Sequence, residues 1–509
     1  MRGSSLVSGL GIVAAFPVVD AHSPVELGHL IDAEERAGGT RIEVRNPARV
    51  AETVGVVFDG GAAEVTAAVD AAAHAAASWS RSDIADRERL LRRAADVIDE
   101  HADRLAVLTA RENGSPLATV RAETGAAAIV FRAIADAVAE RLEPELHRRG
   151  ADGAYVRVER RGFGVVGCIV PWNAPLVLTA NKIAPAIAAG NAVVLKPSPT
   201  SPLGVTVLAR LVGAVFPPGV VSVVNGTAAA VEALIDDPRV GKVSFTGGGQ
   251  TARHVLARAA TALKPVHLEL GGNDPAIVLA DADLTRAAEG IVASAYRRAG
   301  QVCFAVKRVY VPRGQHAELS ALLAERIDGM RVGESLHPET TMGPLNNAAQ
   351  LERVRGIVER TRAAGREVRE LGRPVSQDDW DGGHFLLPHL VTDARQEDEL
   401  VRDEQFGPVL PVVAYDDVAQ AVTWANDTPF GLASSVWSSD PVASAAVARE
   451  IEAGVTFVNS HLFSPEGSRW IPFGGWKQSG MGWEGSPHGI DEYLRFHSVD
   501  GHILTGSRS

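Results

Sequence analysis

Hydrophobic and polar positions along this chain follow two periods, and each period predicts a kind of secondary structure. Between residues 62 and 112, segments such as "AAEVTAAVDAAAHAAASW" repeat apolar residues at helical spacing. At 154–172, the stretch "AYVRVERRGFGVVGCIVPW" first alternates and then becomes continuously apolar. This change predicts a strand that leaves a half-exposed ribbon and enters a buried sheet.

Two groups of short apolar runs follow, with helical segments between many of the runs. The first group is "NAVVLKPS", "GVVSVVNG", "GKVSFTGG" and "PVHLELGG". The second group is "DPAIVLA", "VKRVYVP", "GPVLPVVAY", "SSVWS" and "GVTFVN". Alternation of apolar runs with helices is typical of parallel α/β sheets covered on both faces. The pattern therefore predicts two successive α/β units.

Two strand-like segments remain outside these groups. One is the alternating piece at 154–160, and the other is "DEYLRFHSVDGHIL" near the carboxyl terminus. Strands left over in this way often complete a sheet with another subunit. We therefore expect a homodimer or homotetramer.

Composition narrows the functional classes. The 509 residues are 46% hydrophobic and 22% charged, which predicts a folded protein of two or three compact units. A net charge of −12 argues against a nucleic-acid-binding surface. Two cysteines, Cys168 and Cys303, allow no disulfide framework and have no zinc-ligand spacing around them, so we expect a cytoplasmic protein without a metal site. No apolar run of about eighteen residues predicts a membrane span.

A glycine cluster at the end of one apolar run is a candidate phosphate site. In "FTGGGQTA" the glycines at 247–249 lie between a predicted strand and a predicted helix. They would let the backbone approach a pyrophosphate at the helix N-terminus, where unpaired N–H groups favour anions. The alternative is an ordinary tight turn.

Three further residues have chemistry that the local pattern leaves open. Glu269 in "LELGGN" follows an apolar run and is either ion-paired or a base with a raised pKa. Asn173 in "IVPWNAPL" is either a turn residue or an amide donor to an oxyanion. Cys303 in "GQVC" is either a buried thiol or a nucleophile, whereas Cys168 lies inside an apolar strand and is interpreted as packing.

Seven motifs taken in order decide among these alternatives. They are "IVPWN", "VVLKPS", "SFTGG", "LELGG", "GQVC", "EQFGPV" and "PFGGWKQSG". With them, the chain from about residue 28 onward strongly resembles the aldehyde dehydrogenase superfamily of nicotinamide-dependent enzymes. The resemblance implies that Cys303 is the catalytic nucleophile, Glu269 the general base and Asn173 the oxyanion donor. It also implies an aldehyde as substrate and NAD as cofactor, with NADP possible.

The resemblance assigns further residues to the cofactor, the substrate pocket and a proton relay. Lys182 and Glu484 match a pair that relays protons to the general base in some relatives, the alternative being a surface ion pair. The implied cofactor contacts are Val170, Pro171, Trp172, Lys196, Ser198, Gly247, Gly248, Leu270, Glu404 and Phe406. The implied pocket residues are Ala174, Arg297, Val302, Phe304 and Phe473.

The two groups of apolar runs and the two leftover strands predict a three-part division within the α/β class. We expect a poorly ordered extension at 1–28 and a cofactor domain, an open sheet of modified Rossmann type, at 29–149 and 165–270. The catalytic α/β domain is expected at 271–470. Segments 150–164 and 485–509 are expected to form a small β-ribbon for oligomerisation.

Pro199 and Ala174 depart from the family pattern. Many NAD-specific relatives have a glutamate where this chain has Pro199, but no arginine stands there to hold a 2′-phosphate, so NAD is the expected cofactor. Ala174 replaces the aromatic residue of many relatives and predicts a wide tunnel for an apolar aryl or medium-chain aliphatic aldehyde.

The arginines before the nucleophile support a different substrate. Relatives that act on semialdehydes can have an arginine at the position of Arg297, where it holds the distal carboxylate. The alternative is that Arg297 and Arg298 both lie on the surface of the preceding helix. An ω-carboxylated semialdehyde is therefore the second candidate substrate.

Two other classes compete with a hydrolytic aldehyde dehydrogenase. An acylating enzyme passes its thioester to coenzyme A and often lacks the glutamate base, so Glu269 argues against it. A catalytically inactive structural relative is disfavoured by the intact set of Cys303, Glu269 and Asn173.

Overall fold

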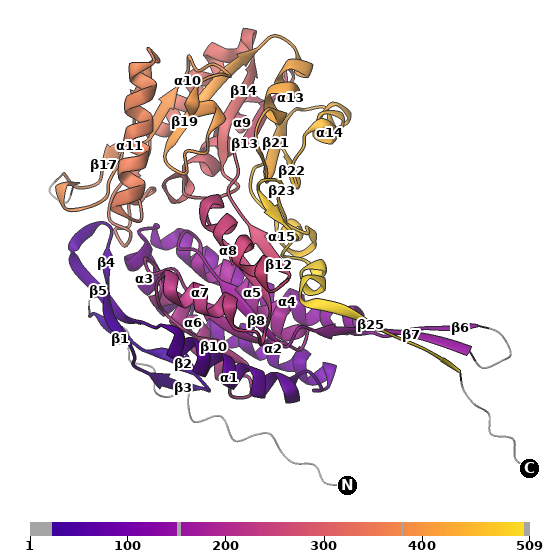
Figure 1. Cartoon of the computed structure of the whole chain (residues 1–509). Coiled ribbons are helices and arrows are strands. Elements are labelled where there is room, and N and C mark those ends of the chain that lie inside the picture. Colours follow the sequence, from indigo (N-terminus) through magenta and orange to yellow (C-terminus); the bar gives the residue numbers. More distant parts are fainter. Residues whose placement is uncertain (1–22, 150–153, 378–379, 503–509) are drawn as a thin grey trace, which may run out of the picture.

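Two large sheets, one below the other in Figure 1, organise the chain. The computed structural model describes residues 23–149, 154–377 and 380–502. Helices cover both faces of each sheet, and a narrow ribbon projects from the lower lobe (Figure 1). The α/β class predicted from the apolar runs is therefore confirmed.

The lower sheet has eight strands with a parallel centre. Its order is β24 (Gly480–Met481), β12 (Val266–Glu269), β11 (Val240–Thr246), β8 (Val165–Ile169), β9 (Ala192–Lys196), β10 (Val221–Val223), β2 (His29–Ile31) and β3 (Glu34–Arg36). The five strands from β12 to β10 are parallel, and the outer strands pair antiparallel. β12, β11, β8, β9 and β10 coincide with predicted apolar runs, because strands buried on both faces need apolar residues throughout.

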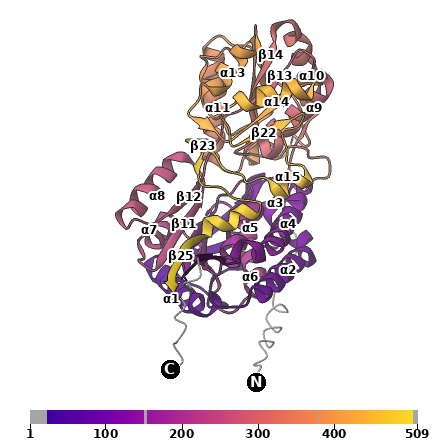
Figure 2. The same ribbon diagram turned by 90° about the vertical axis from the view of Figure 1, so that its right-hand side faces the viewer.

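Helices divide between the two faces of this sheet, as Figure 2 shows from the side. One face carries α1 (Ala62–Trp79), α7 (Ala228–Asp236) and α8 (Gly249–Thr261). The other carries α5 (Pro175–Ala188) and α6 (Leu203–Gly213), with α2 (Ile84–Glu100), α3 (Ala102–Asn113) and α4 (Leu117–Leu142) packed outside them. The connections from β8 to β10 thus run over one face and those from β10 to β12 over the other.

The strand order reverses between β8 and β11. In open α/β sheets, ligands bind beyond the carboxyl ends of the strands at such a reversal. Here those ends face the upper lobe, where Asn173, which follows β8, donates to the Gln301 carbonyl. The candidate site therefore lies between the lobes.

The upper sheet has seven strands and is parallel except for its first edge strand. Its order is β16 (Val368–Glu370), β18 (His389–Val391), β19 (Val409–Tyr415), β14 (Val306–Pro312), β13 (Asp274–Val278), β21 (Ala433–Trp437) and β22 (Val455–Val458). The helices of this lobe are α9 (Leu284–Ala295), α10 (His316–Asp328), α11 (Ala348–Ala363), α12 (Glu399–Arg402), α13 (Val418–Asn426) and α14 (Pro441–Glu450).

Short elements join the lobes. Helix α15 (Pro465–Trp470) and strand β23 (Trp476–Lys477) lie on the path back from the upper lobe to the lower one, and β23 pairs antiparallel with β20 (Phe430–Gly431), which directly precedes β21. Within the upper lobe itself, β15 (Arg331–Val332) pairs with β17 (Arg373–Pro374). Strand β24 then returns to the edge of the lower sheet, a crossing that the predicted domain division did not contain.

The ribbon consists of β6 (Glu145–Arg149), β7 (Ala154–Gly162) and β25 (Leu494–His502). β7 and β25 pair antiparallel over nine residues, and the side chain of Phe496 is 72% exposed. The first ribbon segment, predicted at 150–164, starts too late in the sequence, because β6 adds a strand to the ribbon from residue 145. The prediction of 485–509 began too early, because residues 487–493 form a 3₁₀ segment that packs on α4 and α5. Residues 150–153 and 503–509 lie outside the described residues.

The amino-terminal prediction also needs correction. Residues 25–27 form strand β1, which pairs parallel with β5 (Arg49–Asp59), and β5 pairs with β4 (Thr40–Asn46). The expected extension of 1–28 therefore overlaps the fold from residue 25, and residues 1–22 lie outside the described part. Three-residue strands such as β1 and β2 are too short to show an alternating pattern. Among the described helices, none is long and apolar enough to cross a membrane.

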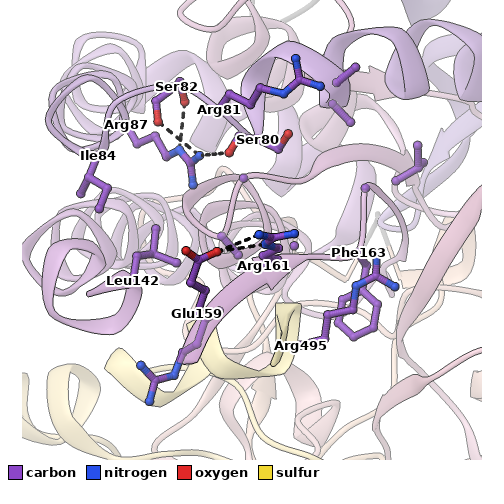
Figure 3. A pocket seen from close by; sticks show the side chains of 18 of the residues that line it. Ser80, Arg81, Ser82, Ile84, Arg87, Leu142, Glu159, Arg161, Phe163 and Arg495 are labelled. Atoms are coloured by element: carbon purple, nitrogen blue, oxygen red, sulfur yellow. Dashed lines mark hydrogen bonds and ion pairs between the residues drawn. The ribbon is translucent and has the colours of Figure 1, made fainter. Parts of the chain in front are cut away.

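An arginine-rich cleft lies where the ribbon meets the turn between α1 and α2 (Figure 3). Arg87 is buried there and donates to the Ser82 hydroxyl and to backbone carbonyls. Glu159 of β7 accepts from Arg161 at 2.8 Å and from Arg157 at 2.7 Å. None of the candidate catalytic residues lines this cleft.

Candidate active site

Neighbouring strands of the lower sheet bring four candidate residues to one edge. Asn173 lies four residues beyond the last residue of β8, and Lys196 ends β9. Gly247 follows β11 directly, and Glu269 ends β12. Because the carboxyl ends of parallel strands meet at the same edge, residues that are far apart in the sequence are gathered there.

The loop that carries Cys303 comes from the upper lobe and is tied to this edge. Asn173 donates its amide Nδ2 to the Gln301 carbonyl at 3.0 Å. Arg298 donates to the Asn173 carbonyl at 2.9 Å and forms an ion pair of 2.6 Å with Glu123 of α4. Glu123 in turn accepts the Leu176 N–H in the first turn of α5. These contacts fix the loop that carries Cys303 relative to Asn173.

The two cysteines have different surroundings. Cys168 is fully buried inside β8, as packing requires, whereas the side chain of Cys303 is partly exposed. Burial by the surrounding protein and the nearby Glu269 carboxylate raise the pKa of the Cys303 thiol, and Lys307 opposes that rise. The thiol therefore has to lose its proton to a base before it can attack a substrate.

Glu269 is a buried carboxylate at the end of β12. Its side chain is buried, and neither carboxylate oxygen has a hydrogen-bond partner among the described residues. Burial, followed by the charge of Glu484, raises its pKa well above the ordinary glutamate value. A buried carboxyl with a raised pKa is suited to general-base chemistry near neutral pH.

Lys182 and Glu484 form a buried ion pair next to this carboxylate. Lys182 Nζ and Glu484 Oε2 are 3.3 Å apart, and both side chains are almost fully inaccessible. The alternative of a surface ion pair is therefore excluded. Asn181 also donates to Glu484 at 3.3 Å, so the Glu484 carboxylate is held from two sides.

The residues expected to hold the cofactor surround the same edge. Lys196 is 5% exposed and forms no ion pair with a described carboxylate, and burial lowers its pKa to about 8. A buried amine without a partner fits a ligand rich in hydroxyl and phosphate oxygens. Gly248 is the N-cap of α8, and a Cβ built there meets nothing within 4 Å, so the N-terminus of this helix is open to a pyrophosphate.

The upper lobe supplies the opposite side of the expected nicotinamide position. Glu404 accepts the Gly272 N–H at 3.2 Å. The rings of Phe406 and Trp172 meet edge to face at 5.6 Å, across the junction of the lobes. The remaining expected contacts are held by backbone bonds, with Val170 N–H donating to the Lys196 carbonyl and Leu270 N–H to the Ser479 carbonyl. Pro171 precedes Trp172 in the same loop. The Ser198 and Thr200 hydroxyl oxygens are 3.2 Å apart.

A comparison with protein families decides which enzymes this arrangement resembles. The model of the aldehyde dehydrogenase family matches residues 34–499. The chain belongs to the aldehyde dehydrogenase family. Membership confirms the predicted enzyme class, a nicotinamide-dependent aldehyde dehydrogenase.

Known members of the family resemble this chain over nearly its whole length. It is 36% identical over 460 residues to a protein of Sinorhizobium fredii (strain NBRC 101917 / NGR234) named probable succinate-semialdehyde dehydrogenase (NADP+). The match covers 89% of this chain and 91% of that protein.

Solved structures of family members share the fold. A structure of an NAD-dependent aldehyde dehydrogenase from Sinorhizobium meliloti is 33% identical, has a TM-score of 0.90, and the match covers 97% of this chain and 98% of that one. A mutant aldehyde dehydrogenase C from Pseudomonas syringae, in complex with NAD+ and octanal, is 35% identical with a TM-score of 0.88. That match covers 96% of this chain and 99% of the other.

Aromatic side chains of this family member gather around Phe304, the residue that follows Cys303. Phe304 meets Phe473 at 5.7 Å and Phe463 at 5.3 Å between ring centroids. Phe463 also packs on Phe457 of β22. The sequence motifs pointed to Phe304 and Phe473 but missed Phe463, whose only signal was an aromatic residue in the segment before "PFGGWKQSG".

The two arginines before Cys303 have different environments. The interpretation that both lie on a helix surface is wrong for Arg298, which is buried because its guanidinium pairs with the buried Glu123. Arg297 is half-buried, and no carboxylate among the described side chains pairs with it. Burial and then the charge of Arg298 lower its pKa. Val302 is buried next to Cys303, and Ala174 is the half-buried N-cap of α5.

Proposed function

We propose that this chain oxidises an aldehyde to the carboxylic acid with a nicotinamide dinucleotide, through a thioester on Cys303. The supporting observation is the convergence of a partly exposed thiol, a buried carboxyl with a raised pKa and an amide at the junction of the lobes. A panel of aldehydes followed at the NADH absorbance band tests the proposal. No NADH with any aldehyde would contradict it.

The first step is addition of the Cys303 thiolate to the aldehyde carbon. The carbonyl oxygen becomes an oxyanion, and the product is a hemithioacetal. An asparagine amide has two N–H donors, and only one of those of Asn173 is used by the Gln301 carbonyl. The other is available to the oxyanion, together with the backbone N–H of Cys303.

The second half of the reaction needs a base for water. When bound, the nicotinamide supplies the acceptor for the hydride that leaves the hemithioacetal carbon, which converts it to a thioester. Glu269 then takes a proton from a water molecule, and the water oxygen attacks the thioester carbon. The acid departs and the sulfur leaves as the Cys303 thiolate. A carboxylate in this position supports hydrolysis over transfer to coenzyme A.

NAD is the proposed preferred cofactor. The buried Lys196 is the residue that we propose contacts oxygens of the adenosine ribose, and Pro199 leaves the position of the ribose-binding glutamate without a carboxylate. Nothing at Pro199 repels a 2′-phosphate, so NADP should be tolerated, and the similar Sinorhizobium fredii protein is named for NADP.

Pro199→Glu is expected to increase the preference for NAD. A carboxylate at this position accepts the ribose hydroxyls and repels a 2′-phosphate, so kcat/KM with NADP should fall at least about tenfold relative to NAD. Steady-state kinetics with both cofactors measure this ratio, and Pro199→Gln controls for the loss of proline. An unchanged ratio in both variants would show that residue 199 does not face the ribose.

An apolar aldehyde is the proposed substrate. The cluster of Phe304, Phe463 and Phe473 presents aromatic surface next to Cys303, and Ala174 adds no bulk beside Asn173. Apolar walls of this kind bind aryl or medium-chain aliphatic groups by burying their surface.

A semialdehyde is the second candidate, and a separate observation favours it. The half-buried Arg297 lacks a carboxylate partner among the described side chains, and such a guanidinium binds a carboxylate well. The Sinorhizobium fredii relative is named as a succinate-semialdehyde dehydrogenase. The aromatic cluster makes the apolar substrate our first choice.

Arg297→Ala separates the two candidates. If the guanidinium holds a distal carboxylate, the variant should lose about 2 kcal/mol or more of transition-state stabilisation for succinate semialdehyde, as measured by kcat/KM. The kcat/KM for butanal should change little. We expect equal small effects on both aldehydes, as the apolar assignment requires. A selective loss for the semialdehyde would overturn that assignment.

Assembly and location are also part of the proposal. The exposed Phe496 and Leu146 on the projecting ribbon favour pairing with another subunit, so we propose a homodimer or homotetramer. Both cysteines are free, which fits the reducing cytoplasm that a thiol nucleophile requires.

A further inference from the structure

One buried titratable side chain next to the general base has no role in the steps above. His267 is fully buried in β12, two residues before Glu269. Side chains two apart on a strand point to the same face of the sheet. His267 and Glu269 therefore share the face of β12 that packs against the Lys182–Glu484 pair.

Ser244 connects His267 to that pair. Ser244 lies on β11 directly beside His267 in the strand register, and its Oγ is 2.9 Å from His267 Nδ1. Lys182 Nζ donates to the same Oγ at 3.2 Å, and the Tyr493 hydroxyl donates to it at 3.0 Å. The buried Ser244 hydroxyl is thus within hydrogen-bond distance of three polar groups, those of His267, Lys182 and Tyr493.

The donors and acceptors at Ser244 determine the tautomer of His267. A serine hydroxyl accepts two hydrogen bonds and donates one. Lys182 and Tyr493 fill both acceptor positions, so the one hydroxyl hydrogen is left for His267 Nδ1. Nδ1 is then an acceptor, and a neutral imidazole must carry its hydrogen on Nε2.

That Nε2–H faces the general base. His267 Nε2 is 3.5 Å from Glu269 Oε1, and neither atom has a hydrogen-bond partner among the described residues. This distance is at the outer limit of a hydrogen bond, and catalytic hydrogen bonds commonly shorten when substrate binds. Two unsatisfied buried groups of opposite polarity have a strong reason to pair.

We propose that His267 is a positioning residue for the general base: held in its Nε2–H tautomer by Ser244, it donates to Glu269 and connects that carboxylate to the Lys182–Glu484 pair. The inference rests on the proposed function, because it assigns Glu269 to thioester hydrolysis. The hydrogen bond stabilises the carboxylate form of Glu269 and holds its oxygens toward the thioester.

The charged groups around His267 favour its neutral form. Burial and then the charges of Lys182 on α5 and Lys242 on β11 lower the pKa of His267 well below the ordinary value. Glu484 and Glu492 act on Glu269 from the segments after β24. Glu492 is paired with Lys242 at 2.9 Å. The buried residues of helix α8 are Ala252, Val255 and Ala259, so this helix places no charged side chain against the sheet.

His267→Leu and His267→Gln test the hydrogen bond in the full-length enzyme. Glutamine keeps an N–H near the position of Nε2, whereas leucine fills the space without a donor. Without the donor the carboxylate form of Glu269 is less stable. The acid limb of the kcat–pH profile should therefore move up by about one pH unit, with a roughly tenfold loss of kcat at neutral pH. Glutamine should restore most of the rate, and the NADH burst should persist in both variants.

Ser244→Ala provides a second test if the His267 variants do not fold. Loss of the hydroxyl removes the tautomer restraint, so the profile should move in the same direction. Ser222→Ala is the matched control, because Ser222 is a buried serine on β10 of the same sheet whose hydroxyl has no described partner. Superimposable profiles for His267→Leu and wild type, equal defects in the leucine and glutamine variants, or equal profiles for Ser244→Ala and Ser222→Ala would overturn the proposal. Absence of NADH formation in the wild type would instead contradict the proposed function.

Discussion

Replacing Cys303 by alanine is expected to abolish aldehyde oxidation while leaving NAD binding nearly unchanged. The thiol forms the bond to the substrate carbon, and no other described cysteine has an accessible side chain. The expected loss in kcat is at least about four orders of magnitude. Stopped-flow measurement of NADH and titration of NAD by fluorescence quenching give the two quantities.

Cys168→Ala is the matched control for this prediction. Cys168 is fully buried in β8 and burial raises the pKa of its thiol to about 12, so it is neither accessible nor readily ionised. Its removal should reduce stability slightly and leave the rate of NADH formation close to that of wild type. Substantial residual oxidation by Cys303→Ala would refute the assigned nucleophile.

Replacing Glu269 by glutamine is expected to separate the two halves of the reaction. Glutamine keeps the shape of the side chain but cannot accept the proton of water, so hydrolysis should slow by roughly 10²–10⁴-fold. A burst of NADH equal to the enzyme concentration should precede a slow steady state. Equal loss of the burst and of the steady state would contradict this role, unless Glu269 also activates the Cys303 thiol.

The pH dependence of the steady-state rate in the wild type also tests Glu269 as the base. The pKa of Glu269 is raised, chiefly by burial, so the carboxyl stays protonated to a higher pH than an ordinary glutamate. The base form, and with it the steady-state rate, should therefore increase as the pH rises through that pKa. In Glu269→Gln this limb should be absent.

The sequence pattern predicted the strands of both sheets where the runs are apolar on both faces. β9, β11 and β14 are examples, and the candidate residues Lys196 and Glu269 lie at strand ends for the reason that the pattern implied. Local periodicity could not predict the short amino-terminal strands or β24. β24 has two residues and joins a sheet formed by residues more than two hundred positions earlier.

Long-range contacts are the other part that the sequence pattern could not predict. Arg298 and Glu123 are separated by 175 positions, so nothing near "YRRAG" indicated that its second arginine is buried in an ion pair. Ser244 and His267 are a second example, because nothing in the sequence of either strand indicates that the two side chains meet. Their chemistry arises only where β11 and β12 lie side by side.

Peptide mass spectrometry of Glu269→Gln tests most directly whether a covalent thioester forms on Cys303. The variant is mixed with NAD and an aldehyde such as hexanal, quenched in acid and digested. A mass increase equal to the acyl group minus one hydrogen is expected on the peptide that contains Cys303 and not on the peptide with Cys168. Formation of NADH without such an adduct, or an adduct on Cys168, would contradict the account.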